Sequence, residues 1–105
     1  MDDFERKIFL QIIGDAKGYP KSQENKKQIG FSYQELSRLY KEILSNPNKE
    51  LNTQEKQAIL NSIDGALDYV NTDIPSLYNI SEEELQSFKT KLEEQWRIKS
   101  TYKRS

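Results

Sequence analysis

The sequence predicts an all-α protein, folded as an antiparallel four-helix bundle, and three observations lead to that prediction. Apolar residues recur every three or four positions in four separate segments, which is the spacing of one helix face. No segment sustains the alternation typical of a half-buried strand, and Val, which favours strands, occurs only at position 70. The length of 105 residues suits one small domain, which we expect to span residues 1–105.

The first predicted helix covers residues 3–17, with its apolar residues on one face. Gly14 and Gly18, with Pro20, end it, because glycine favours the C-terminal cap and proline cannot continue a helix. Residues 18–31 are polar and basic and are expected to form a loop. A loop of this length is unusual in a small bundle, so we interpret it as either mobile or functional.

The second predicted helix covers residues 32–46 and has a strong start signal. Ser32 and Glu35 have the spacing of a capping box, in which each side chain binds the backbone N–H of the other residue. Phe31 and Leu36 flank this box at the positions of a hydrophobic staple. The sequence therefore predicts that this helix starts at residue 32.

The third predicted helix covers residues 52–71, starting at Asn52 with Glu55 three residues later. Gly65 lies within its apolar stripe. We interpret Gly65 as a site where two helices approach closely, with a functional hinge as the alternative. Each helix of the bundle is expected to contribute one apolar stripe to a shared core.

The fourth predicted helix covers residues 81–99 and repeats the start signal of the second. Ser81 and Glu84 form the expected capping box, and Ile80 and Leu85 the staple. The acids at the start of this helix suit the helix dipole, so we interpret them as structural and not catalytic. The end of the chain is expected to be a flexible tail over residues 100–105.

The composition excludes many active sites. The chain has no Cys and no His, which removes cysteine nucleophiles, Cys-based metal sites and the commonest general base. No glycine-rich phosphate loop is present. We therefore expect a protein that is not an enzyme, with no catalytic residue, no metal and no cofactor.

Charge and targeting signals set further bounds. The net charge is −1 and the pI about 5.5, so a dedicated nucleic-acid-binding domain is not expected. The start at Asp2 and Asp3 differs from a secretory signal, and no apolar run reaches the roughly 20 residues that span a bilayer. We expect a cytoplasmic protein, with peripheral contact at the inner face of the membrane as an alternative.

Two basic segments, 17–27 and 97–105, and an abundance of tyrosine favour a protein partner, because aromatic and basic side chains are common at interfaces. Trp96 has a structural alternative, in which its ring closes the core. The oligomeric state is not predicted. The candidate partner-binding residues are Tyr19, Lys21, Lys26, Lys27, Tyr78, Trp96, Arg97, Lys99, Tyr102, Lys103 and Arg104.

One stretch carries a family resemblance. It reads Leu39-Tyr40-x-x-Ile43-Leu44-x-Asn46-Pro47, then Leu51, Glu55, Ile59-Leu60 and Ala66-Leu67. This pattern resembles the opening helix pair of the immunity proteins that protect Gram-positive bacteria from pediocin-like (class IIa) bacteriocins. The resemblance implies a cytoplasmic four-helix bundle that binds a membrane sugar transporter occupied by the bacteriocin. By that analogy, residues 96–104 would form the end that recognises the bacteriocin.

Two other functions fit the same sequence. One is a small regulator or inhibitor from a phage or another mobile element, which binds a host protein. The other is a nucleic-acid adaptor that uses the basic C-terminal tail, where Trp96 and Tyr102 alternate with cations. Binding by such an adaptor would weaken steeply as salt is raised. We take immunity as the first interpretation and keep both alternatives.

Overall fold

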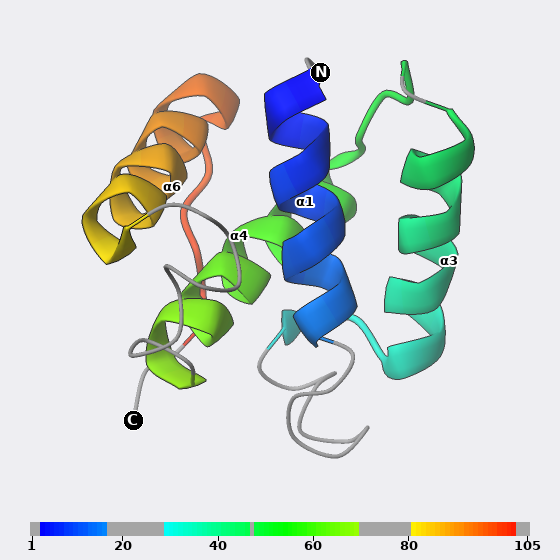
Figure 1. Cartoon of the computed structure of the whole chain (residues 1–105), viewed down its shortest axis with the longest axis horizontal. Coiled ribbons are helices and arrows are strands. Elements are labelled where there is room, and N and C mark those ends of the chain that lie inside the picture. The colour runs from blue at the N-terminus through cyan, green and yellow to red at the C-terminus, as the bar shows by residue number, and fades with distance from the viewer. Residues whose placement is uncertain (1–2, 17–28, 47, 70–80, 103–105) are drawn as a thin grey trace.

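The helices pack in a chain of contacts, α1 on α3, α1 on α4 and α4 on α6. A computed structural model describes residues 3–16, 29–46, 48–69 and 81–102, and these contain four helices and no strand. Figure 1 shows α1 and α3 running in opposite directions and α4 crossing behind α1. Helix α6 lies on the side of α1 opposite to α3. The predicted all-α four-helix bundle is confirmed. The helices are α1 (Asp3–Ala16), α3 (Tyr33–Ser45), α4 (Thr53–Tyr69) and α6 (Glu82–Trp96).

Helix α4 is the centre of the molecule, and the expectation of one apolar stripe per helix is wrong for it. Its residues 58–65 are all buried, so the buried surface goes fully around the helix. The reason is that α1 packs on one side of α4 and α6 on another. Asp64 is among these buried residues, and its carboxylate pairs with the ammonium of Lys89 on α6 at 2.8 Å. Pairing reduces the cost of burying both charges.

Both predicted capping boxes are present. In the first, the Glu35 backbone N–H donates to Ser32 Oγ at 3.2 Å, and the Ser32 N–H donates to Glu35 Oε1 at 3.1 Å. In the second, Ser81 and Glu84 make the same pair of bonds at 3.0 and 3.1 Å. Glu84 therefore has a structural role at the start of α6.

Removing the first cap gives a modest, local prediction. Ser32→Ala deletes the oxygen that accepts the Glu35 N–H, so we expect the free energy of unfolding to fall by about 1 kcal/mol. Chemical denaturation measures this change. Ser37→Ala, the same substitution inside α3, is the control and should change stability by less than about 0.5 kcal/mol. Equal losses in the two variants would contradict the role of the cap.

An arginine joins α1 to the end of α3. Arg6 donates from Nη2 to the Leu44 carbonyl at 2.8 Å and from Nε to the Ile43 carbonyl at 3.3 Å. These carbonyls lie in the last turn of α3, where no helical partner remains for them. The guanidinium therefore caps α3 from a neighbouring antiparallel helix.

Helix α6 is shorter than predicted. It ends at Trp96, and the expected continuation to residue 99 is wrong. Arg97 has the left-handed backbone conformation, with φ 59° and ψ 34°, which terminates the helix. The predicted starts of α1, α3, α4 and α6 lie within one residue of the observed ones. Most of the predicted loop 18–31, from 18 to 28, lies outside the described residues.

Candidate partner-binding cleft

Four of the predicted partner-binding residues lie within the part of the chain that the structure describes. Trp96 and Arg97 lie at the end of α6, whereas Lys99 and Tyr102 lie on the segment that follows, which Figure 1 shows running back along α4. The remaining candidates lie outside the described residues; they are Tyr19, Lys21, Lys26, Lys27, Tyr78, Lys103 and Arg104.

Trp96 is half-buried and its ring is held on two sides. Its ring centroid lies 6.0 Å from that of Phe9 on α1, with the two planes tilted by 46°. The ammonium of Lys56, on α4, lies 5.8 Å from the same centroid, a distance at which a cation is attracted to the ring face. The core-packing alternative for Trp96 is therefore correct for part of the ring, which packs against the buried cluster.

The rest of Trp96 lines an open cleft of about 490 Å³. The cleft lies where the first half of α1, the connection between α3 and α4, the start of α4 and the end of α6 meet. Its lining residues are Glu5, Phe9, Asn48, Lys49, Glu50, Leu51, Lys56, Gln95 and Trp96. Its lining therefore combines apolar side chains, among them Leu51 and Trp96, with charged groups of both signs.

Lys49 holds the α3–α4 connection in place. Its ammonium lies 3.2 Å from Glu55 Oε2 and 3.7 Å from Glu42 Oε2. Glu55 also accepts the Asn52 backbone N–H at 2.9 Å, and Asn52 Oδ1 accepts the Glu55 N–H at 2.8 Å, so Asn52 caps α4 as predicted. One lysine thus joins the end of α3 to the start of α4.

The C-terminal segment is anchored, and the expected flexible tail is wrong for residues 100–102. Buried Asn61 of α4 accepts at Oδ1 from the Thr101 backbone N–H at 2.8 Å and from Ser100 Oγ at 3.0 Å. Its Nδ2 donates to the Ile29 carbonyl at 3.0 Å and to Thr101 Oγ1 at 3.1 Å, while Gln57 Nε2 donates to Oδ1 at 3.3 Å. One side chain therefore ties α4 to two distant segments.

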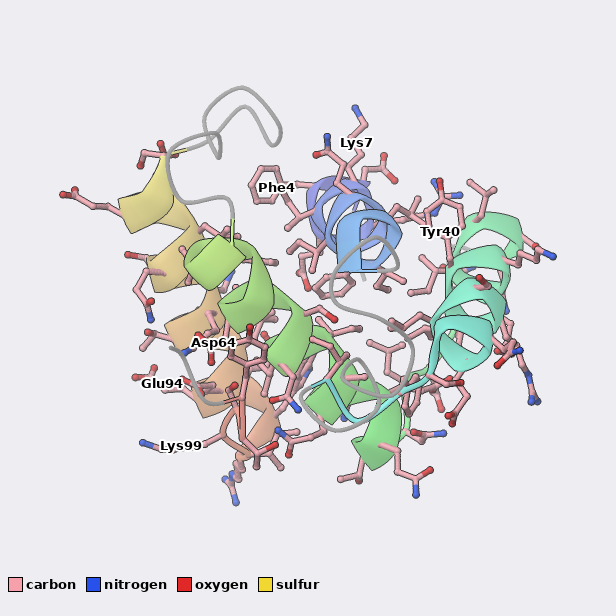
Figure 2. All side chains as sticks on the ribbon, turned by 90° about the horizontal axis from the view of Figure 1, so that it is seen from below. Phe4, Lys7, Tyr40, Asp64, Glu94 and Lys99 are labelled. Atoms are coloured by element: carbon pink, nitrogen blue, oxygen red, sulfur yellow. The ribbon has the colours of Figure 1, made fainter. Side chains whose placement is uncertain are left out.

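This anchoring separates the other two placed candidates from the cleft. The Lys99 carbonyl accepts a hydrogen bond from Gln57 Nε2 at 2.7 Å. The side chain of Lys99 extends away from the body of the molecule (Figure 2). Tyr102 is half-buried and packs against the core. The backbone around these residues is thus part of the fold, and of the four placed candidates Trp96 is the one that lines the cleft.

Sequence reasoning missed the residues that organise this region. Lys49 and Lys56 read as ordinary surface cations, because only the fold brings them to Glu55 and Trp96. Asn61 did carry a signal, since a polar pair at 61–62 interrupts an otherwise apolar run in the third predicted helix. A polar residue in a buried run is informative, because it needs partners in the interior.

Among the described residues, no group of three acidic, histidine or cysteine side chains could hold a metal ion. None of the described helices is long and apolar enough to cross a bilayer. Comparison with known proteins found no matching family model, no matching curated protein and no matching solved structure. The choice of the Trp96 cleft therefore rests on its geometry and chemistry.

Proposed function

We propose that this chain is a non-enzymatic helical binding protein that takes a segment of a protein partner into the Trp96 cleft. The observation that supports this is the Trp96 ring, which contacts Phe9 and Lys56 and is partly exposed at an open cleft. Tryptophan is enriched among the residues that dominate binding energy, because it combines a large apolar face with a polar N–H. A ring that is already ordered loses little conformational entropy on binding.

The cleft walls indicate the kind of segment that fits. Lys49 is paired with two carboxylates, and the other charged residues that line the cleft are Lys56, Glu5 and Glu50. With both signs present, the cleft favours no strongly charged ligand. It suits a segment with one apolar anchor residue flanked by polar groups of both signs.

The resemblance to bacteriocin immunity proteins suggests the first partner to test, a sugar transporter occupied by a pediocin-like bacteriocin. The chain is expressed in a sensitive Gram-positive strain, and the lowest inhibitory bacteriocin concentration is measured. In parallel, the tagged chain is used to capture proteins from detergent-solubilised membranes, with and without bacteriocin. We expect protection, and capture of the transporter only when bacteriocin is present.

Variants of the cleft test whether it is the binding surface. Trp96→Ala should weaken capture at least about tenfold, as expected for a central aromatic contact. Because Trp96 also packs on the core, Trp96→Ala can lower the stability of the fold. Two further single variants, Glu50→Lys and Gln95→Arg, therefore change exposed residues that line the cleft. Both variants should weaken binding without lowering Tm. Lys41→Glu, at an exposed position of α3 that lines none of the clefts described, is the control.

Other outcomes have equally definite meanings. Capture of a cytosolic protein with or without bacteriocin, lost in Trp96→Ala, would keep the binding function and replace immunity by regulation of a host protein. Binding to nucleic acid that falls steeply with salt would favour the adaptor. Capture that survives the Trp96, Glu50 and Gln95 variants would show that the cleft is not the binding surface.

A further inference from the structure

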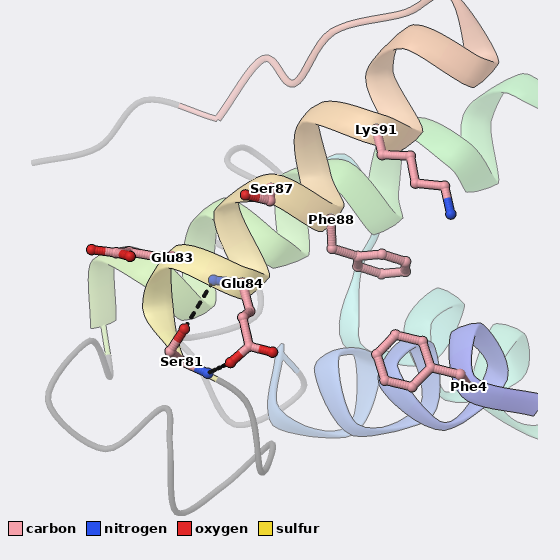
Figure 3. A pocket seen from close by; sticks show the side chains of 7 residues that line it. All are labelled: Phe4, Ser81, Glu83, Glu84, Ser87, Phe88 and Lys91. Atoms are coloured by element: carbon pink, nitrogen blue, oxygen red, sulfur yellow. Dashed lines mark hydrogen bonds between the residues drawn. The ribbon is translucent and has the colours of Figure 1, made fainter.

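A second concave surface lies between the start of α1 and the outer side of α6, and it shares no lining residue with the Trp96 cleft. This groove has a volume of about 640 Å³. Phe88 on α6 forms one wall, and Phe4 on α1 faces it from the other side (Figure 3). Their ring centroids are 6.1 Å apart in an edge-to-face arrangement. We call this surface the Phe4 groove.

Phe4 is the unusual member of this pair. Phe88 is only 9% exposed, whereas Phe4 exposes 56% of its surface. Among the described residues, Leu44 is the other large hydrophobic side chain with comparable exposure. Covering the Phe4 ring would remove apolar surface from water, and an exposed aromatic beside a groove is a feature of interaction sites.

The edge of the groove on α6 carries opposite charges at its two ends. Glu84 and Lys91 lie on one face of the helix, seven residues or about 10 Å apart, with the small Ser87 between them. All three are exposed. Within the part of the chain that the structure describes, Lys91 makes no ion pair. Figure 3 shows Glu84, Phe88 and Lys91 directed toward the side of α6 that faces Phe4.

This arrangement is complementary to itself. In an antiparallel pair of identical helices, residue i of one lies opposite residue j of the other when i + j is constant. If two α6 helices cross beside Ser87, each Glu84 lies opposite the partner copy's Lys91. The small serine at the crossing point allows a close approach, and the exposed edge of one copy fits the groove of the other. Two identical ion pairs then flank two covered Phe4 rings.

We propose that the Phe4 groove is the interface of a two-fold symmetric dimer, in which the α6 helices of two copies pair antiparallel. Such an interface uses the same patch on both subunits, as two-fold symmetry requires. An interface of standard size covers about 800 Å² on each subunit, about an eighth of the 6487 Å² that the chain exposes. A small domain buries a smaller share of its surface than a large one, so association adds apolar burial.

The association of the full chain is measured by sedimentation equilibrium over a range of concentrations up to about 500 µM, which detects binding as weak as a millimolar Kd. We expect a monomer–dimer equilibrium. Lys91→Glu places like charges at both ends of the interface and should weaken the dimer at least about tenfold. Phe4→Ala should also weaken it. Lys41→Glu, the same charge change on α3, should leave the dimer constant unchanged.

A charge exchange tests the antiparallel register itself. The second variant is Glu84→Lys, which keeps the bond from the residue-84 N–H to Ser81 Oγ and gives up the return bond from the Ser81 N–H to the Glu84 carboxylate. Alone, this variant and Lys91→Glu should each remain largely monomeric. Mixed, they should form a heterodimer about as stable as the unmodified dimer, since every facing pair is again of opposite sign.

Three results would overturn the proposal. They are a chain that stays monomeric at about 500 µM, a dimer that Lys91→Glu does not weaken, and a mixture that fails to associate although both variants remain folded. None of these results bears on the Trp96 cleft, so the failure of one proposal leaves the other standing.

Discussion

Replacing Asn61 with Ala is expected to lower the free energy of unfolding by about 3 kcal/mol and to release the C-terminal segment. The substitution removes five hydrogen bonds at a site that is 2% exposed. The Thr101 N–H and the Ile29 carbonyl would lose their Asn61 partner, and each polar group left unsatisfied in the interior costs about 1–3 kcal/mol. Water that reaches the loosened segment would keep the total below the sum of these terms.

Two measurements separate local release from global loss. Chemical denaturation gives the change in stability, and hydrogen exchange of the Thr101 amide reports whether the segment has detached. Asn48→Ala, at an exposed position, is the matched control and should change stability by less than about 0.5 kcal/mol. If Asn61→Ala leaves the Thr101 amide as protected as in the original protein, the anchoring role of Asn61 is wrong.

Phe9→Ala should have the largest effect of the substitutions considered, a loss of about 3–5 kcal/mol. The Phe9 side chain is fully buried, and its ring contacts both Phe88, at 5.9 Å between centroids, and Trp96, at 6.0 Å. Truncation leaves a cavity where α1 meets α6, which a packed interior fills only in part. Because small domains have total stabilities of about 5–15 kcal/mol, Tm should fall by about 15 °C or more.

Phe4→Ala supplies a control on the same helix with the same chemical change. Since Phe4 is largely exposed, its truncation should cost the monomer about 1 kcal/mol or less. Calorimetry at a concentration where the chain is monomeric compares the two variants. Equal destabilisation by Phe4→Ala and Phe9→Ala would mean that α1 does not pack through Phe9.

The fold class and the helix starts were predictable because their signals are local. A capping box needs only the backbone near Ser32 or Ser81, and an apolar face needs only the helix period. Asn52 was recognised as the start of α4 for the same reason, and the structure places its side chain on the Glu55 N–H. These interactions form within a few residues, so sequence spacing is enough to find them.

The end of α6 shows where local reasoning fails. The apolar residues Ile98 and Tyr102 continue a helical spacing, which predicted a longer helix. In the structure both side chains reach the core from a non-helical segment that turns at Arg97. Tertiary contacts with α4 compensate for the left-handed conformation of a non-glycine residue, which has an intrinsic cost.

In the candidate site, too, one part could be predicted from the sequence and the rest could not. Trp96 was selected from composition, because an aromatic residue next to cations is visible in any sequence. Its neighbours Phe9 and Lys56 are 87 and 40 positions away along the chain, as their residue numbers show. No local pattern relates such residues. The pairing of Lys49 with Glu55, which orders the cleft wall, also depends on how the α3–α4 connection turns.

By itself the sequence determined the fold class, the starts of the helices and the lack of cysteine and histidine chemistry, because these follow from residue types and short spacings. Tertiary structure alone decided that α4 is enclosed on all sides over residues 58–65, that Asn61 anchors the C-terminal segment, and that Phe4 is left exposed beside Phe88. The physical reason is that burial and hydrogen-bond partners at these positions come from helices distant in the chain, whose crossing is set by the packing of the whole core.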